Sequence, residues 1–244
     1  HWYFDNQFAH FLLPPAIDSG HPPTFGMYIA SLWLLFGKSL AVSHFAMLPF
    51  TLMSIFLLHQ IGNYFLGMRN GLWLVTLMCV DPTFAAQSLL VSPDVMLFTF
   101  FLLGLYAVLK NKVGWLMIAC IGLAAVSVRG MMVVVVLFIF KVVFDTNRPF
   151  KLTFLLKQIA PFVPSGLVAA SFLAYHYWQT GWIGYHEDSP WAASFERVDL
   201  GGLVKNIALL GWRLLDFGRV FVVLTALMLL FQQWRLNNGF TKQL

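Results

Sequence analysis

Long apolar runs recur along the chain and restrict its fold more than any other feature. They lie at about 43–66, 71–90, 95–109, 113–144, 158–178 and 214–234, separated by short polar segments. A helix needs about 20 apolar residues to cross a bilayer, and these runs are too many for one buried core. They are continuous, whereas the strands of a membrane barrel alternate apolar and polar residues. We therefore predict an all-α fold, a polytopic transmembrane bundle of about seven spans.

Composition excludes several other classes of protein. The 244 residues are 59% hydrophobic and 10% charged, where soluble domains carry about 25% charged residues. The net charge of +5 includes no basic cluster with interleaved aromatic residues, so no nucleic-acid partner is expected. Cys79 and Cys120 lie far apart in apolar runs, which favours packing over a disulfide or a zinc site.

Breaks inside the apolar runs predict where helices end. Asp81-Pro82 should kink or end the helix within 71–90. The run 113–144 is too long for one span, and "SVRGMM" from Ser127 to Met132 is its only plausible turn, which predicts two short helices. The apolar segment 24–37 reaches only roughly 21 Å as a helix, so we expect it to lie at the membrane surface.

Charge sets the expected orientation, because cytoplasmic loops are enriched in basic residues. The segments between the predicted spans place these basic residues together on one side, with Asp145 as the only acid: Arg69, Lys110, Lys112, Arg148, Lys151, Lys157, Arg235 and Lys242. The other side receives most acids and two polar segments, a first outer loop at 1–42 and a second at 179–202.

We expect one membrane domain over 1–244, in a bacterial inner membrane with its site facing the periplasm. Because the chain begins with His1, we expect a fragment that lacks at least the first transmembrane helix.

Two charged residues at predicted helix ends are candidates for binding substrate. Asp94 follows Ser92 and Pro93 where a helix re-enters the membrane, so it either completes a helix cap or acts on a substrate. Arg129 lies at the tip of two short helices, below the expected membrane surface, where an arginine needs a partner. It either reaches toward lipid headgroups or binds a phosphate with its guanidinium fork.

Two further constellations have a structural and a functional interpretation. "GYHEDSPW" places His186, Glu187 and Asp188 between aromatic residues, as an ordinary loop, a sugar-binding segment or a weak site for a divalent metal. "WRLLDFGR" places Arg213, Asp216 and Arg219 at three-residue spacing, which predicts a salt-bridge ladder along one helix face.

The order of several short motifs resembles the GT-C glycosyltransferases, in the branch of the protein O-mannosyltransferases and the lipid A aminoarabinose transferases. The resemblance covers about residues 17–145 and rests on these motifs: His21-Pro22-Pro23, Phe36-Gly37, "LPF" at Leu48–Phe50, Phe65-Leu66-Gly67, "SPD" at Ser92–Asp94, and "GLAAVSVRG" at Gly122–Gly130. It implies transfer of a sugar from a polyprenyl-phosphate carrier to a glycan, lipid or protein acceptor outside the cytoplasm, with inversion at the anomeric carbon.

The resemblance also implies roles for individual residues. Arg129 would stabilise the charge on the departing lipid phosphate, Asp94 would lie near donor or acceptor, and His21 would line the site. The family's catalytic base is a carboxylate of the first outer loop, for which Asp5 is the candidate; a base upstream of His1 is the alternative, and Asp18 lies too near the Pro-Pro element. The competing functions are a membrane transporter or lipid flippase, which should show inverted repeats and mid-membrane charges, and a non-catalytic family member.

Overall fold

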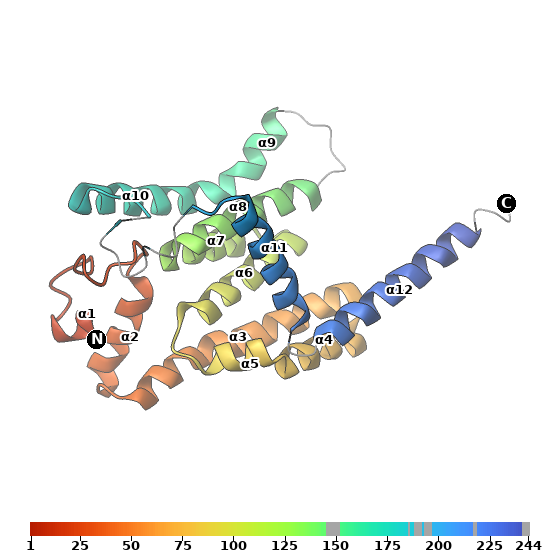
Figure 1. Ribbon diagram of the computed structural model, residues 1–244, viewed down its shortest axis with the longest axis horizontal. Coiled ribbons are helices and arrows are strands. Elements are labelled where there is room, and N and C mark those ends of the chain that lie inside the picture. Colours follow the sequence, from red (N-terminus) through yellow and green to blue (C-terminus); the bar gives the residue numbers. More distant parts are fainter. Residues whose placement is uncertain (145–151, 185, 188–191, 193–196, 217–218, 241–244) are drawn as a thin grey trace. The chain divides into compact units, whose positions relative to one another are not determined.

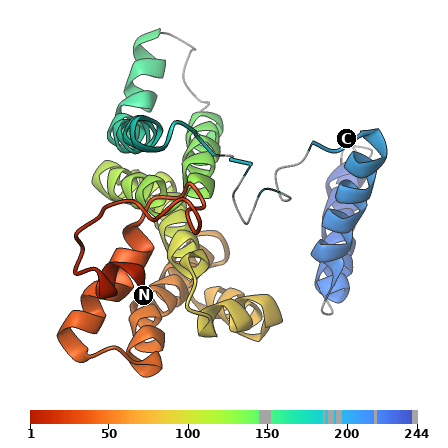
Figure 2. The same ribbon diagram turned by 60° about the vertical axis from the view of Figure 1, so that its left-hand side comes forward.

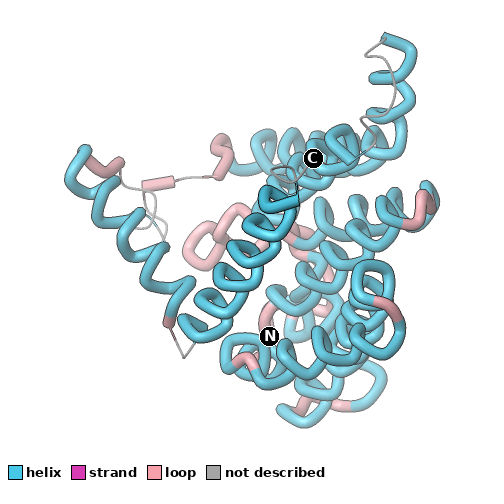
Figure 3. The backbone as a smooth tube through the Cα atoms, turned by 90° about the vertical axis from the view of Figure 1, so that its right-hand side faces the viewer, coloured by secondary structure: helices cyan, strands magenta, loops and turns pink. Residues whose placement is uncertain are grey.

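The computed structural model describes residues 1–144, 152–184, 186–187, 192, 197–216 and 219–240. All regular secondary structure in these ranges is helical, as Figure 3 shows, so the predicted all-α fold is confirmed. The elements are α1 (Trp2–Asp5), α2 (Thr24–Phe36), α3 (Leu40–Leu66), α4 (Met68–Val80), α5 (Pro82–Leu89), α6 (Pro93–Leu109), α7 (Val113–Val126), α8 (Val128–Phe144), α9 (Leu152–Ile159), the 3-10 helix η1 (Ala160–Phe162), α10 (Val163–Thr180), α11 (Leu200–Leu215) and α12 (Arg219–Phe240).

The chain divides into two compact units, His1–Phe195 and Glu196–Leu244. In the first unit, α3 packs against α4 and α6, and α7 packs against α6, α8 and α10 (Figure 1). The second unit consists of α11 and α12, which contact each other. The expectation of one membrane domain over the whole chain stays a prediction.

Helix α6 is the central element of the first unit. Its buried side chains enter three separate apolar clusters: one with α7 and α8, one with α2 and the start of α3, and one with the rest of α3. Between α3 and α6, Ser54 and Thr99 share a buried hydrogen bond of 2.8 Å. Because α6 is enclosed on so many sides, its first turn, which carries Asp94, has a well-defined position.

Helix breaks fall where the sequence predicts them. Asp81 ends α4, and the bend of 69° between α4 and α5 lies at Asp81-Pro82. Ser127, in an extended conformation, separates α7 from α8 within the predicted turn. Gly130 then lets the two helices approach closely, because a Cβ there would overlap the carbonyl oxygen of Leu123.

The second unit departs from the sequence interpretation. Helix α11 ends at Leu215, Asp216 has an extended backbone, and α12 starts at Arg219. Arg213, Asp216 and Arg219 therefore do not share one helix face, and the predicted ladder along a single helix is wrong. In the predicted last span, Arg219–Met228 is a short apolar stretch of α12, and the helix itself continues to Phe240.

Two described helices are long and apolar enough to cross a membrane, Leu40–Leu66 and Phe154–Thr180, and the bent α4–α5 pair would make a third. Many of their apolar side chains point outward, including Phe45 and Leu167, which suits contact with lipid. The chain thus has the features of a membrane protein, while about seven spans remain a prediction. Of the two cysteines, Cys120 is buried as predicted, whereas Cys79 is exposed on α4.

Candidate functional site

Asp94 and Arg129 form an ion pair between two helix N-termini. Arg129 Nη2 lies 3.2 Å from Asp94 Oδ1. Asp94 is in the first turn of α6, where the Ser92 hydroxyl accepts a hydrogen bond from its backbone N–H. Arg129 is in the first turn of α8, and its N–H donates to the Ser127 hydroxyl at 3.2 Å. Asp94 is therefore both part of a helix start and the partner that the sequence required for Arg129.

Much of the Arg129 side chain is not covered by protein. Its exposed fraction is 61%, against 38% for Asp94. A guanidinium has five N–H donors in a planar fork, and a single contact with Asp94 leaves others able to bind. The site can therefore accept an oxyanion on the exposed side of Arg129, with Asp94 fixing the guanidinium from the other.

His21 belongs to the same site. Burial lowers the pKa of its imidazole, the nearby positive charge of Arg129 lowers it further, and Asp18 opposes the shift. Its Nδ1 atom is buried and has no hydrogen-bond partner among the described residues. Pro22 and Pro23 follow directly, and the Thr24 hydroxyl donates to the carbonyl oxygen of Ala125 at 2.6 Å, which ties the start of α2 to the end of α7. The structure thus places His21 near the Asp94–Arg129 pair, while the substrate-binding role of the three residues stays a prediction.

Asp5 has a different environment. Its Oδ1 atom lies 2.6 Å from Lys38 Nζ, and both side chains are substantially exposed. The Lys38 ammonium also lies over the rings of Phe4 and Trp33, at 5.2 and 5.7 Å from their centroids. Among the described residues, no ion pair joins Asp5 to Arg129. Because the Lys38 ammonium already occupies Asp5 Oδ1, the Asp5 side chain would have to leave Lys38 before this oxygen could accept a proton from an acceptor hydroxyl.

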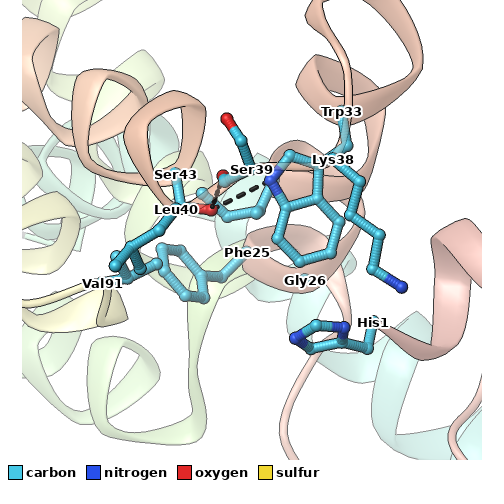
Figure 4. Close-up of a pocket in the computed structure, with 10 residues that line it drawn as sticks. His1, Phe25, Gly26, Trp33, Lys38, Ser39, Leu40, Ser43 and Val91 are labelled. Carbon is cyan, nitrogen blue, oxygen red and sulfur yellow. Dashed lines mark hydrogen bonds between the residues drawn. The ribbon is translucent and has the colours of Figure 1, made fainter.

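A cleft lies beside Lys38, between α2 and the start of α3 (Figure 4). Its volume is about 660 Å³, and its walls are largely apolar, with Phe25, Ile29, Trp33 and Val91 among them. The Trp33 indole N–H donates to the Ser43 hydroxyl at 2.9 Å, which fixes that wall. Because Val91 closely precedes Asp94 in the chain, the cleft borders the turn that carries the Asp94–Arg129 pair.

The second outer segment is described only in part, and its predicted binding role stays a prediction. The ring of His186 packs on that of Trp182 at 5.1 Å between centroids, and Glu187 is exposed. Asp188 lies outside the described residues. Within the described part of the chain, no group of three or more His, Cys, Asp or Glu side chains is placed to bind a metal ion. Among the described residues, the ion pair of Arg129 is with Asp94, and no ion pair joins Arg129 to Glu187.

Sequence reasoning missed a buried pair beside this site. His176 Nε2 lies 2.9 Å from Asp18 Oδ2, and both residues are almost fully buried. His176 comes from the last turns of α10, in an apolar run, and Asp18 comes from the loop before His21. Their separation of 158 residues explains why no local pattern could connect them. In Figure 2 the first loop is drawn in red and α10 in teal.

Comparison of the chain with protein-family models, with curated proteins and with solved structures found no match in any of the three. The function therefore has to be argued from the residues of the site.

Proposed function

We propose that this chain is part of a membrane glycosyltransferase that moves a sugar from a polyprenyl-phosphate carrier to an acceptor outside the cytoplasm. The observation that carries the proposal is the Asp94–Arg129 pair: a partly exposed guanidinium, fixed by a carboxylate at two helix N-termini. The positive ends of both helices add to the attraction for a phosphate. The motif order shared with GT-C enzymes supports the same assignment.

In the proposed reaction, an acceptor hydroxyl oxygen attacks the anomeric carbon of the donor sugar. The bond between that carbon and the phosphate oxygen breaks, and the phosphate leaves with the electron pair. Arg129 stabilises the charge that develops on the phosphate, an electrostatic role that is often the largest contribution to catalysis. A carboxylate of the first outer loop, Asp5 or one upstream of His1, takes the acceptor proton. Attack from the face opposite to the phosphate inverts the configuration.

The proposal includes a location and partners. The site would face the periplasm of a bacterial inner membrane, because the basic loops mark the cytoplasmic side. The donor would be a sugar linked to polyprenyl phosphate, whose apolar polyprenyl chain lies in the bilayer. The acceptor would be a glycan, a lipid or a protein.

Replacement of Arg129 tests this function. In the full-length protein in membranes, we expect Arg129→Ala to lower sugar transfer by about 100-fold or more, because a transition-state charge loses its partner. Arg129→Lys should recover only part of the rate, since lysine keeps the charge without the fork. The control is Arg197→Ala, which removes the same charge from an exposed position. Transfer at the normal rate by Arg129→Ala would contradict the proposal.

Replacement of Asp5 tests the identity of the base. We expect Asp5→Asn to abolish transfer if Asp5 takes the proton, and the loss should appear in kcat more than in KM. Lys38→Ala is the companion variant, because it frees the Asp5 carboxylate from its ion pair. If Asp5→Asn stays active while Arg129→Ala is inactive, a carboxylate other than Asp5 is the base.

A further inference from the structure

The buried pair of Asp18 and His176 has a geometry that specifies its protonation. The His176 ring presents Nε2 to the Asp18 carboxylate at 2.9 Å and Nδ1 to the carbonyl oxygen of Trp182 at 3.0 Å. The Thr180 hydroxyl also lies 3.2 Å from Nδ1, but its hydrogen is directed to the His176 carbonyl oxygen at 2.7 Å. Each ring nitrogen therefore faces acceptors. A neutral imidazole has only one N–H, which the Trp182 carbonyl oxygen requires at Nδ1, so the contact with Asp18 needs a second proton, and the ring carries it when the carboxylate is ionised.

Burial makes the charges depend on each other. The side chains of His176 and Asp18 are only 2% and 4% exposed. An isolated charge at such a position is very costly, whereas a hydrogen-bonded pair of opposite charges is tolerated. The second oxygen of Asp18 is also satisfied, because it accepts the Gly20 N–H at 2.8 Å.

In the described part of the chain, Tyr3, His21 and His186 are titratable groups near the pair. Burial, and then the charge of Asp18, raise the pKa of Tyr3 to about 12, so this phenol stays neutral at ordinary pH. His21 senses both Asp18 and Arg129. On the far side, the Trp182 ring lies between His176, at 4.5 Å, and His186, at 5.1 Å between centroids.

The pair fixes the turn that leads to the candidate site. Gly20 has a φ of +69°, and a Cβ there would lie 2.9 Å from the Trp182 ring. The turn therefore packs closely against Trp182, whose carbonyl oxygen is bound by His176. His21 follows immediately in the chain. Anything that loosens the contact between Asp18 and His176 should therefore displace His21 from Arg129.

We propose that Asp18 and His176 form a buried carboxylate–imidazolium pair that holds the 17–21 turn and so positions His21 beside Arg129. The two residues are positioning residues, not catalytic ones. The inference does not depend on sugar transfer, because it concerns the conformation of the loop.

The protonation can be measured directly. The protein in lipid nanodiscs, with ¹⁵N-labelled histidine, should show a pair of ring-nitrogen signals at neutral pH that both belong to protonated nitrogens and that are absent in His176→Gln. Signals from one protonated and one bare nitrogen at His176 would overturn the proposal. This measurement on the wild-type protein remains decisive even if a variant does not fold.

Asp18→Asn and Asp5→Asn form a matched pair of variants. Each removes one carboxylate from the first outer loop, but Asp18 is buried with His176 and Asp5 is exposed with Lys38. We expect hydrogen exchange of the 17–21 backbone to speed up by about tenfold or more in Asp18→Asn, since a buried charge loses its partner, and little in Asp5→Asn. Equal exchange rates in the two variants would overturn the proposal.

Discussion

At the scale of single residues, the candidate site consists of His21 and two nearby ion pairs. Arg129 is paired with Asp94 at 3.2 Å, Asp18 is paired with His176 at 2.9 Å, and His21 senses one member of each pair. The sequence pointed to Asp94 and Arg129 because charged residues at helix starts in an apolar chain are unusual, and to His21 through the Pro-Pro motif of the family resemblance. It did not identify His176, because a histidine inside an apolar run gives no indication of a partner 158 residues away.

The pKa of His21 provides a test at this scale. Burial and the Arg129 charge lower it, so the unfolded chain binds a proton at higher pH than the folded protein does. The contribution of His21 to stability is therefore present above the unfolded value of about 6.5 and is lost as the pH falls toward the folded value. We expect Arg129→Gln to move the His21 pKa upward in a ring-NMR titration and Asp94→Asn to move it less. If the pKa of His21 is the same in Arg129→Gln as in the wild type, the guanidinium lies too far from His21 to affect its titration.

At the scale of elements, the break between α7 and α8 gives Arg129 its place. Ser127 is extended, Arg129 starts the next helix, and Gly130 lies against the backbone of Leu123. The sequence predicted this break because the run 113–144 exceeds one span and contains a single polar interruption. A different argument, from charge spacing, was wrong at Trp212–Arg219. The three-residue spacing suggested one helix, but α11 ends at Leu215 and the backbone of Asp216 is extended. Spacing alone does not reveal such an end, since Asp in a helix interior and Asp at a helix end have the same sequence pattern.

Replacing Gly130 should disturb the hairpin and the site together. A Cβ there would overlap the Leu123 carbonyl oxygen, which belongs to backbone and cannot rotate away. We expect Gly130→Ala to destabilise the protein by about 1–3 kcal/mol and to lower its thermal midpoint in detergent. Gly114→Ala in α7 is the matched control: a Cβ there meets nothing within 4 Å, so alanine should be neutral or stabilise the helix by less than about 1 kcal/mol. Similar losses in both variants would rule out the close approach as the cause.

At the scale of the whole molecule, two or three of the described helices can cross a membrane by length and composition. The helical class was predictable, since apolar runs without alternation leave few options. The number of spans was not, because several apolar helices are shorter than a bilayer, among them α6, α7 and α2. For such helices, neighbouring segments and lipid decide whether they cross, tilt or lie at the surface.

Labelling of single cysteines tests the orientation. In a background with Cys79 and Cys120 replaced by alanine, we expect Asn6→Cys to react with an impermeant maleimide from the periplasmic side and Lys112→Cys to react only after the membrane is opened. The reason is that Lys110 and Lys112 belong to the basic side, and the first loop to the acidic one. Labelling of both positions from the same side would contradict the proposed topology.

The contact between Asp18 and His176 also has a consequence for biogenesis. The ribosome delivers the first loop long before α10, so the loop must wait through the synthesis of more than half of the chain before its partner emerges. During that interval the loop has no buried ion pair to order it, and its closure carries the entropy cost of a long chain segment. The candidate site should therefore mature late, after α10 has entered the membrane. Translation intermediates halted before His176 should expose the 17–21 segment to added protease, while those halted after α10 should protect it.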